Sequence, residues 1–269
     1  MRSDQASAAY EKPIKIVENG GISRVSLNLP ERFNALGPVM VDALRSYFEG
    51  LLQRTDIRIV ILDGVGKHFC AGLDLKQEVE AGPRTPEAMM QIQLNIRAIM
   101  LAMRRCPQPI IAIVQGAASG GGFAIALAAD IRLGTPDARM NAAALRLGLT
   151  GGDMGISYFL PRMIGSSAAA EFMLTGRFIG AARAHALGLF SQVGELCALH
   201  EEADQLAADM LRVPPLALRL TKDGLTHALN ASSLEAAMAL EDRQQVLCTM
   251  SEDFRHELQR FLEGKRRNS

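Results

Sequence analysis

Three consecutive glycines, Gly120, Gly121 and Gly122, lie between a β-branched apolar run at 110–114 and an Ala-rich apolar stretch at 123–129. This pattern predicts a buried strand, a tight turn and a helix. The first N–H groups of a helix have no intrahelical acceptor, and the helix dipole is positive at that end. The segment therefore indicates a site for developing negative charge, where glycine lets a ligand approach the backbone closely. The alternative is that the glycines only allow tight packing of the helix on the strand.

A second glycine-rich segment, LGLTGGDMGISY at 147–158, contains one carboxylate. This acid, Asp153, could transfer protons if its loop borders a bound substrate. It could equally cap a helix that begins near Gly155, which is a common role of aspartate. His68 precedes the segment FCAGLDL at 69–75 and could face a substrate, but a solvated loop histidine is the favoured interpretation. The sequence lacks G-x-S-x-G, a complete Walker A motif and G-x-G-x-x-G.

Charge and cysteine usage argue against several classes of protein. The chain has 269 residues, with 29 Lys and Arg against 29 Asp and Glu. A net charge of zero argues against electrostatic binding to nucleic acid or an anionic membrane. No apolar run reaches the roughly 18 residues of a membrane-spanning helix, and the polar first residues do not resemble a secretory signal. The four cysteines are scattered without metal-ligand spacing, so we expect no metal site and a cytoplasmic protein with reduced thiols.

Strands and helices alternate through most of the sequence. The predicted strands are 14–17, 22–27, 58–63, 110–114, 131–134, 138–141 and 191–195, with a hairpin turn at Asn19-Gly20-Gly21. The predicted helices are 38–52, 86–105, 123–129, 159–163, 167–175 and 181–186, and 78–86 is expected to be a mobile surface loop. From about residue 201 the pattern is helical, including one or two amphipathic helices over 232–263. We predict an α/β core at 1–200 and a C-terminal helical region at 201–269.

Five motifs carry a resemblance that covers roughly residues 12 to 265. They are PERFNAL (30–36), RIVILDGVGKHFCAGLDLK (58–76), PQPIIAIVQGAASGGGFAIALAADIRL (107–133), LPRMIG (160–165) and TGRFIGAARAHALGLFSQV (175–193). In this order and spacing they resemble the crotonase, or enoyl-CoA hydratase/isomerase, superfamily. The resemblance implies a spiral of repeated ββα units with a C-terminal helical region that mediates trimers. Hexamers formed as dimers of trimers are common in that superfamily, so we expect a homotrimer or homohexamer.

The resemblance also implies an oxyanion hole, in which two backbone N–H groups hold the carbonyl of a CoA thioester and stabilise an enolate. By motif, the donors are Leu73, which follows Ala71 and Gly72, and Gly121 in the glycine turn. Backbone donors are oriented in advance, and each can contribute about 3–4 kcal/mol to an oxyanionic transition state. No separate cofactor is implied, because CoA is part of the substrate.

Contacts to CoA are implied by the same motifs. The residues concerned are Arg32, Ala71, Asp74, Leu75, Phe261 and Lys265. Arg32 resembles a basic residue near the nucleotide phosphates, and the backbone around Asp74 resembles a segment that contacts adenine. Phe261 and Lys265 resemble residues that reach the CoA of a neighbouring subunit. Arg32 and Lys265 could instead be ordinary solvated charges, and for Asp74 a hydrogen bond within its own loop is favoured over catalysis.

Two positions depart from the family pattern. A standard hydratase holds its water between two glutamates, and the matching positions here are Ala124 and Ala144. Because alanine cannot exchange protons, Asp153 is the best remaining acid, and isomerases of the family can work with one carboxylate. We predict an enzyme of the hydratase/isomerase type that acts on an acyl-CoA or enoyl-CoA thioester. The main alternative is an acyl-CoA-binding protein with little or no catalysis, and a minor one is dehalogenase- or hydrolase-like chemistry with Asp153 as nucleophile.

Overall fold

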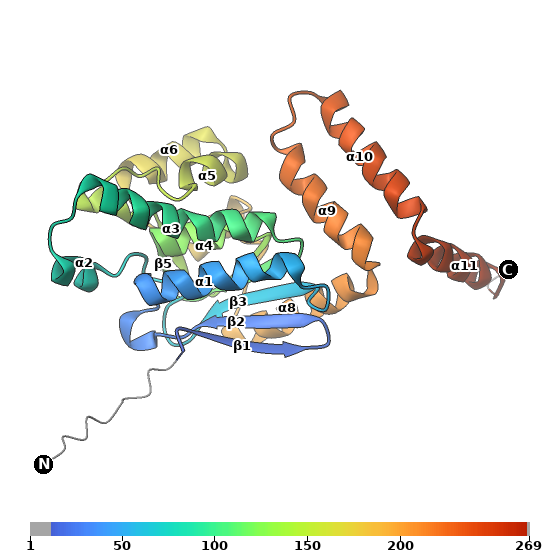
Figure 1. The fold of residues 1–269 in the computed structure, drawn as a ribbon, viewed down its shortest axis with the longest axis horizontal. Coiled ribbons are helices and arrows are strands. Elements are labelled where there is room, and N and C mark those ends of the chain that lie inside the picture. The colour runs from blue at the N-terminus through green and yellow to red at the C-terminus, as the bar shows by residue number, and fades with distance from the viewer. Residues whose placement is uncertain (1–11, 268–269) are drawn as a thin grey trace, which may run out of the picture.

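The strands form two β-sheets, and the first three strands of the larger sheet lie side by side below helix α1 (Pro38–Gly50) in Figure 1. The computed structural model describes the backbone of residues 12–267 and the side chains of residues 12–263. The larger sheet has the order β1 (Ile14–Asn19), β2 (Ile22–Leu27), β3 (Ile59–Gly64), β4 (Ile110–Val114), β6 (Ile131–Gly134) and β9 (Gln192–Val193). Its first pair is antiparallel and every later pair is parallel. The smaller sheet joins β5 (Ala117–Ser119), β7 (Arg139–Asn141) and β8 (Ile179–Gly180).

The helices surround these sheets and continue beyond them. They are α1 (Pro38–Gly50), α2 (Leu75–Ala81), α3 (Pro86–Arg105), α4 (Gly121–Ala128), α5 (Ile156–Ile164), α6 (Ser166–Thr175), α7 (Ala181–Ala186), α8 (Leu196–Arg212), α9 (Pro215–Ala228), α10 (Leu234–Thr249) and α11 (Glu252–Arg267). The predicted hairpin and the helix over 86–105 are confirmed. The loop predicted at 78–86 is partly wrong, because α2 extends to Ala81 and begins with a side-chain cap from Asp74.

A strand–strand–helix unit repeats along the chain and confirms the α/β class. In the unit β4–β5–α4, the first strand joins the larger sheet and the second joins the smaller one. The unit β6–β7–α5 divides its strands between the sheets in the same way. The sequence predicted β4, β6 and β7 but not β5 or β8, which are only three and two residues long.

Helices cover both faces of the larger sheet, with α1 and α3 over one face and α8 over the other (Figure 1). Side chains alternate along β3, where Val60 and Leu62 join one apolar cluster while Ile59 and Ile61 join a second. Such double burial explains why this strand is an almost continuous apolar run. The second cluster is completed by Leu199, Ala203 and Ala207 of α8. The predicted boundary between residues 200 and 201 therefore falls inside a helix that packs on the sheet.

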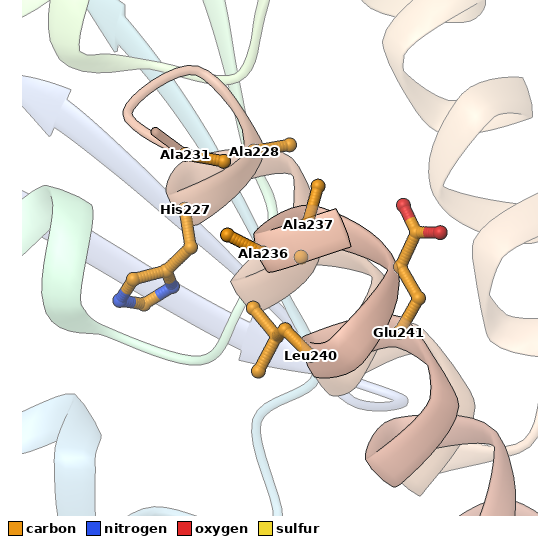
Figure 2. A pocket seen from close by; sticks show the side chains of 8 residues that line it. His227, Ala228, Ala231, Ala236, Ala237, Leu240 and Glu241 are labelled. Carbon is orange, nitrogen blue, oxygen red and sulfur yellow. The ribbon is translucent and has the colours of Figure 1, made fainter. Parts of the chain in front are cut away.

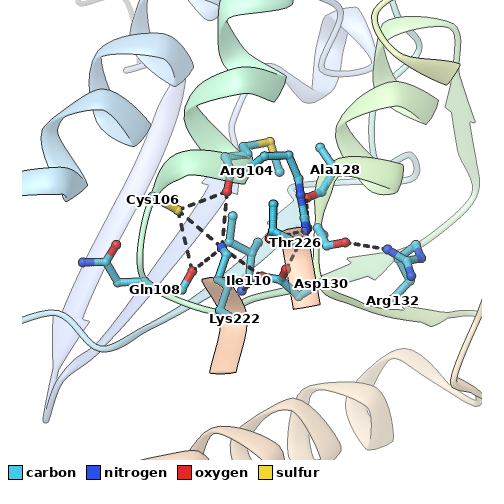
Figure 3. A network of polar contacts seen from close by, with 11 residues as sticks. Arg104, Cys106, Gln108, Ile110, Ala128, Asp130, Arg132, Lys222 and Thr226 are labelled. Carbon is cyan, nitrogen blue, oxygen red and sulfur yellow. Dashed lines mark hydrogen bonds and ion pairs between the residues drawn. The ribbon is translucent and has the colours of Figure 1, made fainter. Parts of the chain in front are cut away.

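A polar cluster attaches α9 to this core (Figure 3). Lys222 is only 5% exposed, and its Nζ lies 3.0 Å from Asp130 Oδ2 and 2.7 Å from the carbonyl oxygen of Gln108. Arg104 at the end of α3 also pairs with Asp130, at 2.8 Å, and donates to Thr226 of α9. Because burying an ammonium group requires a counter-charge, Asp130 is the centre of the attachment.

Helices α10 and α11 lead away from the core (Figure 1). A small cavity of about 150 Å³ lies between α9 and α10, lined mainly by alanines and by Leu240 (Figure 2). Large apolar side chains on these last two helices and on the residue that caps α10 are exposed, among them Leu234, Val246, Leu247, Met250, Phe254 and Leu258. In the part of the chain that the structure describes, no helix is both long and apolar enough to cross a membrane.

The Asp130 cluster gives a prediction about stability. Asp130→Ala leaves Lys222 buried without a counter-charge and removes the acceptor of the Ile110 N–H group. We expect the free energy of unfolding to fall by about 3–5 kcal/mol. Lys222→Met should cost clearly less, because Asp130 keeps its pairing with Arg104. Urea denaturation of both variants measures the difference, and equal losses would contradict the role given to Asp130.

Candidate active site

The segment after β3 lies against the glycine turn. Gly72 has a φ of +88°, and a Cβ at this position would lie 2.5 Å from the carbonyl oxygen of Ser119 and 3.3 Å from the N atom of Gly121. The N–H of Leu36 donates to the carbonyl of Gly72 at 2.7 Å, and Leu36 and Leu73 form a parallel bridge. In this bridge Leu36 bonds to the residues on either side of Leu73, so the N–H of Leu73 faces away from Leu36.

The glycine turn itself is shaped by backbone contacts. Gly120 has a φ of +50°, and its N–H donates to the carbonyl of Asn141 at 2.9 Å. Helix α4 begins at Gly121, and all its residues are buried. A Cβ on Gly122 would lie 2.2 Å from the carbonyl oxygen of Cys70, so this glycine does serve tight packing. The packing alternative thus accounts for Gly122 but not for the N–H group of Gly121.

Two backbone donors in this region have no acceptor. Neither the N–H of Leu73 nor that of Gly121 donates a hydrogen bond to any residue that the structure describes. Gly121 is buried and Leu73 is partly buried against the core. Unpaired N–H groups are costly in the interior of a protein, and such a pair on neighbouring segments can bind an anionic oxygen.

Asp153 lies in a loop that contacts the glycine turn. The next residue, Met154, has a φ of +49°. A Cβ added to Gly121 would lie 3.2 Å from the Sδ of Met154, so the two residues are in contact. The side chain of Asp153 accepts a hydrogen bond from Gln93 of α3. The N-cap of α5 is Gly155, without any side-chain cap, so the interpretation of Asp153 as a helix cap is wrong. Gln93 could not be predicted from the sequence, because α3 and this loop meet only in the folded chain.

The positions matched to CoA contacts fall into two groups. Arg32 and Asp74 form an ion pair of 2.9 Å, in which the carboxylate is largely buried and the guanidinium half-exposed. Asp74 also accepts from the N–H of Gln77, which confirms the expected hydrogen bond within its own loop. The N–H of Ala71 donates to the carbonyl of Phe33, and Leu75 at the start of α2 is exposed.

The second group lies on the last helix. Phe261 is exposed on α11, which extends away from the core (Figure 1). Lys265 follows on the same helix, and its side chain lies outside the described residues. The structure thus brings Arg32, Ala71 and Asp74 together, and it places Phe261 on a separate part of the chain.

His68 differs from the expected solvated loop histidine. It is half-buried, its ring lies 5.3 Å from that of Phe33, and its Nδ1 accepts from the N–H of Ala117 at 3.2 Å. Burial lowers the pKa of the ring below its usual value, with smaller contributions from the positive charges of Lys67 and Arg139. The residue is therefore a neutral acceptor that ties its loop to the start of β5.

Comparison with known proteins shows which family the chain belongs to. The family model described as enoyl-CoA hydratase/isomerase matches residues 17–268. The chain belongs to the enoyl-CoA hydratase/isomerase family. A Mycobacterium tuberculosis protein named probable enoyl-CoA hydratase is 36% identical over 251 residues, which cover 90% of this chain and 88% of that protein. The 1,2-epoxyphenylacetyl-CoA isomerase of Escherichia coli is 31% identical over 243 residues, which cover 90% of this chain and 92% of that enzyme.

Solved structures give the same relationship. The crystal structure of an enoyl-CoA hydratase from Mycobacterium smegmatis superposes with a TM-score of 0.88 at 30% identity. The match covers 94% of this chain and 97% of that structure. The crotonase fold expected from the sequence motifs is therefore confirmed.

Two alanines stand at the positions that the motifs match to the glutamates of a hydratase. Ala124 on α4 is fully buried, and Ala144 lies partly buried in the short 3-10 helix at Ala143–Leu147. If Gly120 carried a Cβ, that atom would lie 3.9 Å from the Cβ of Ala143, the residue before Ala144. This short helix therefore flanks the glycine turn. Asp153 is the carboxylate whose own loop contacts Gly121.

The close approach at Gly72 gives a prediction. In Gly72→Ala the added Cβ would meet the carbonyl oxygen of Ser119, whereas Gly148 has a similar φ of +79° with no atom near its Cβ position. Both alanine variants adopt an unfavourable backbone conformation, but only the first also forces two segments apart. We expect Gly72→Ala to lose about 1–3 kcal/mol more unfolding free energy than Gly148→Ala. Equal losses in urea denaturation would contradict a contact at this point.

The environment of His68 gives a prediction about pH. Because its pKa is lower in the folded chain, the unfolded chain takes up the proton first as the pH falls. The contribution of neutral His68 to stability is present above about pH 6.5 and is lost toward its lower folded value. His68→Asn keeps an acceptor but cannot titrate, so its unfolding free energy should fall less between pH 7 and pH 5. His256→Asn, at an exposed position on α11, should keep the wild-type dependence.

Proposed function

We propose that this chain is an acyl-CoA enzyme of the isomerase type, which moves a proton along an enoyl-CoA through an enolate. The observation that carries the proposal is a pair of unpaired backbone N–H groups beside a loop with a single carboxylate. The donors are Leu73 and Gly121, and the carboxylate is Asp153. Alanine at both usual glutamate positions favours this transfer over hydration, which needs groups that hold and activate water.

The proposed reaction uses one carboxylate twice. The thioester carbonyl accepts hydrogen bonds from the N–H groups of Leu73 and Gly121. Asp153 takes a proton from one carbon of the enoyl chain, the electron pair moves toward the carbonyl oxygen, and an enolate forms. The same carboxyl returns the proton two carbons away, so the double bond moves and the atoms balance. Each backbone donor can supply about 3–4 kcal/mol to the enolate-like transition state, where the oxygen charge is greatest.

The CoA part of the substrate is assigned to the other end of the site. We infer that Arg32 faces the nucleotide phosphates and that the backbone of Ala71, Asp74 and Leu75 contacts the adenine. In support, the Arg32 side chain is 40% exposed and uses NH1 for its ion pair with Asp74. The ion pair fixes the guanidinium while one face stays open to a phosphate. The relative from Escherichia coli is named as an isomerase of a CoA thioester, which agrees with this substrate class.

The assembly and compartment are part of the proposal. The exposed apolar side chains of α10 and α11 support a homotrimer or homohexamer, because a lone chain would leave this surface in water. Phe261 and Lys265 would then reach the CoA of a neighbouring subunit. The four cysteines are free, which supports a reducing compartment such as the cytoplasm.

Acyl-CoA binding without turnover is the second candidate, and the two alanine positions favour it. Holding a thioester needs only the backbone donors and the CoA contacts, whereas conversion also needs Asp153. The aspartate-nucleophile alternative is weaker. The dehalogenases that it resembles also use a Trp and a His near the ring, whereas this sequence contains no Trp and α3 contains no His.

Turnover of trans-3-hexenoyl-CoA tests the proposal. The wild type should convert it to the 2-enoyl isomer, and Asp153→Asn should be slower by about 100-fold or more, because general acid–base catalysis is lost. Asp42→Asn is the matched control, since Asp42 is an exposed acid on α1 that pairs with Arg45. Crotonyl-CoA should be hydrated poorly by all three proteins.

The outcomes separate the two candidates. Tight binding of acyl-CoA by the wild type without conversion of the 3-enoyl or 2-enoyl ester would support the binding protein and reject the enzyme. Full activity of Asp153→Asn would show that another group transfers the proton.

A further inference from the structure

Gln93 lies where α3 passes the loop that contains Asp153. Its neighbours Ile92 and Ile96 turn inward and pack in the apolar core, which fixes this turn of the helix. Gln93 itself is exposed, and its side-chain amide donates from Nε2 to Oδ1 of Asp153. The hydrogen bond therefore joins a rigid helix to the loop beside the glycine turn.

The loop has little else to fix its carboxylate. Met154 and Gly155 both have positive φ values, and the helix that follows has no side-chain cap. Within the described part of the chain, the bond from Gln93 is the one side-chain hydrogen bond that Asp153 makes, and its Oδ2 has no partner. One carboxylate oxygen is thus held and the other is open.

We propose that Gln93 is a positioning residue that orients Asp153 for proton transfer. By occupying Oδ1 from α3, it leaves Oδ2 as the oxygen directed at the substrate carbon. An amide suits this role, because it donates a hydrogen bond without the full charge of a Lys or Arg, which would weaken the carboxylate as a base. This inference rests on the proposed function, since it needs Asp153 as the acid–base group.

The test compares Gln93→Leu and Gln93→Glu with Gln91→Leu. The Leu change removes the donor, and the Glu change keeps the shape while replacing the donor with an acceptor. Gln91 is an exposed glutamine on the same helix that bonds to Asn95 instead, so it is the matched control. With trans-3-hexenoyl-CoA, both Gln93 variants should lose about 10- to 100-fold in kcat with little change in KM, because a misplaced catalytic group slows the chemical step.

Hydrogen exchange of the Ile156 amide, whose N–H donates to the carbonyl of Asp153 at 2.9 Å, tests the contact without any substrate. It should be faster in Gln93→Leu than in the wild type and unchanged in Gln91→Leu. Unchanged exchange in Gln93→Leu would overturn the contact itself. Faster exchange with wild-type kcat, or an equal loss of kcat in Gln91→Leu, would reduce Gln93 to a structural role and overturn the inference.

Failure of the proposed function has a different signature. If Asp153→Asn keeps full activity, or if the wild type converts no enoyl-CoA, then Asp153 is not the acid–base group. Both proposals then fail together, even if the exchange data show the contact. If Asp153→Asn is inactive while both Gln93 variants keep their kcat, only the positioning role of Gln93 fails.

Discussion

The site depends on two stretches of backbone that lie against each other with almost no side chain between them. The N–H of Ser119 donates to the carbonyl of Cys70 at 3.0 Å, and the N–H of Cys70 donates to the carbonyl of Ala117 at 3.1 Å. Gly72 and Gly122 have room for no more than a hydrogen atom at this contact. Close packing and main-chain hydrogen bonds therefore set the direction of the unpaired N–H groups. A backbone held in this way moves far less than the backbone of an exposed loop.

Strand order brings these two stretches together. One follows β3 and the other follows β4, and the two strands are neighbouring and parallel in the larger sheet. Carboxyl ends of parallel strands meet at one edge of a sheet, where ligands commonly bind in α/β proteins. Burial on both faces by α1, α3 and α8 holds that edge in place. The apolar side chains on both faces of β3 thus contribute directly to the geometry of the site.

The sequence pattern predicted those helices and strands that are determined by interactions between residues close together in the chain. The span of α3 follows from its proline, its Thr85 cap and its apolar period, and the helix after the glycine turn follows from its composition. Elements that depend on distant partners were missed, because β5 is defined by its pairing with β7 and not by its own three residues. The role of Asp153 as a cap was wrong for the same reason, since the partner of its side chain, Gln93, lies 60 positions earlier in the sequence. The glycine pattern indicated unpaired N–H groups at the start of α4, and the resemblance added Leu73 and singled out Gly121.

The burial of Ala124 bears on what this site can catalyse. Ala124 has no exposed surface and belongs to the main apolar cluster, next to Phe123 and Ile125. A carboxylate at this position would have to be buried without water, at a cost of several kcal/mol unless a partner were supplied. Alanine at this position therefore completes the apolar cluster without introducing a buried charge. Under the proposed function, the chemistry is transfer of a proton that the substrate already carries, in which the carboxylate of Asp153 acts together with the two backbone donors.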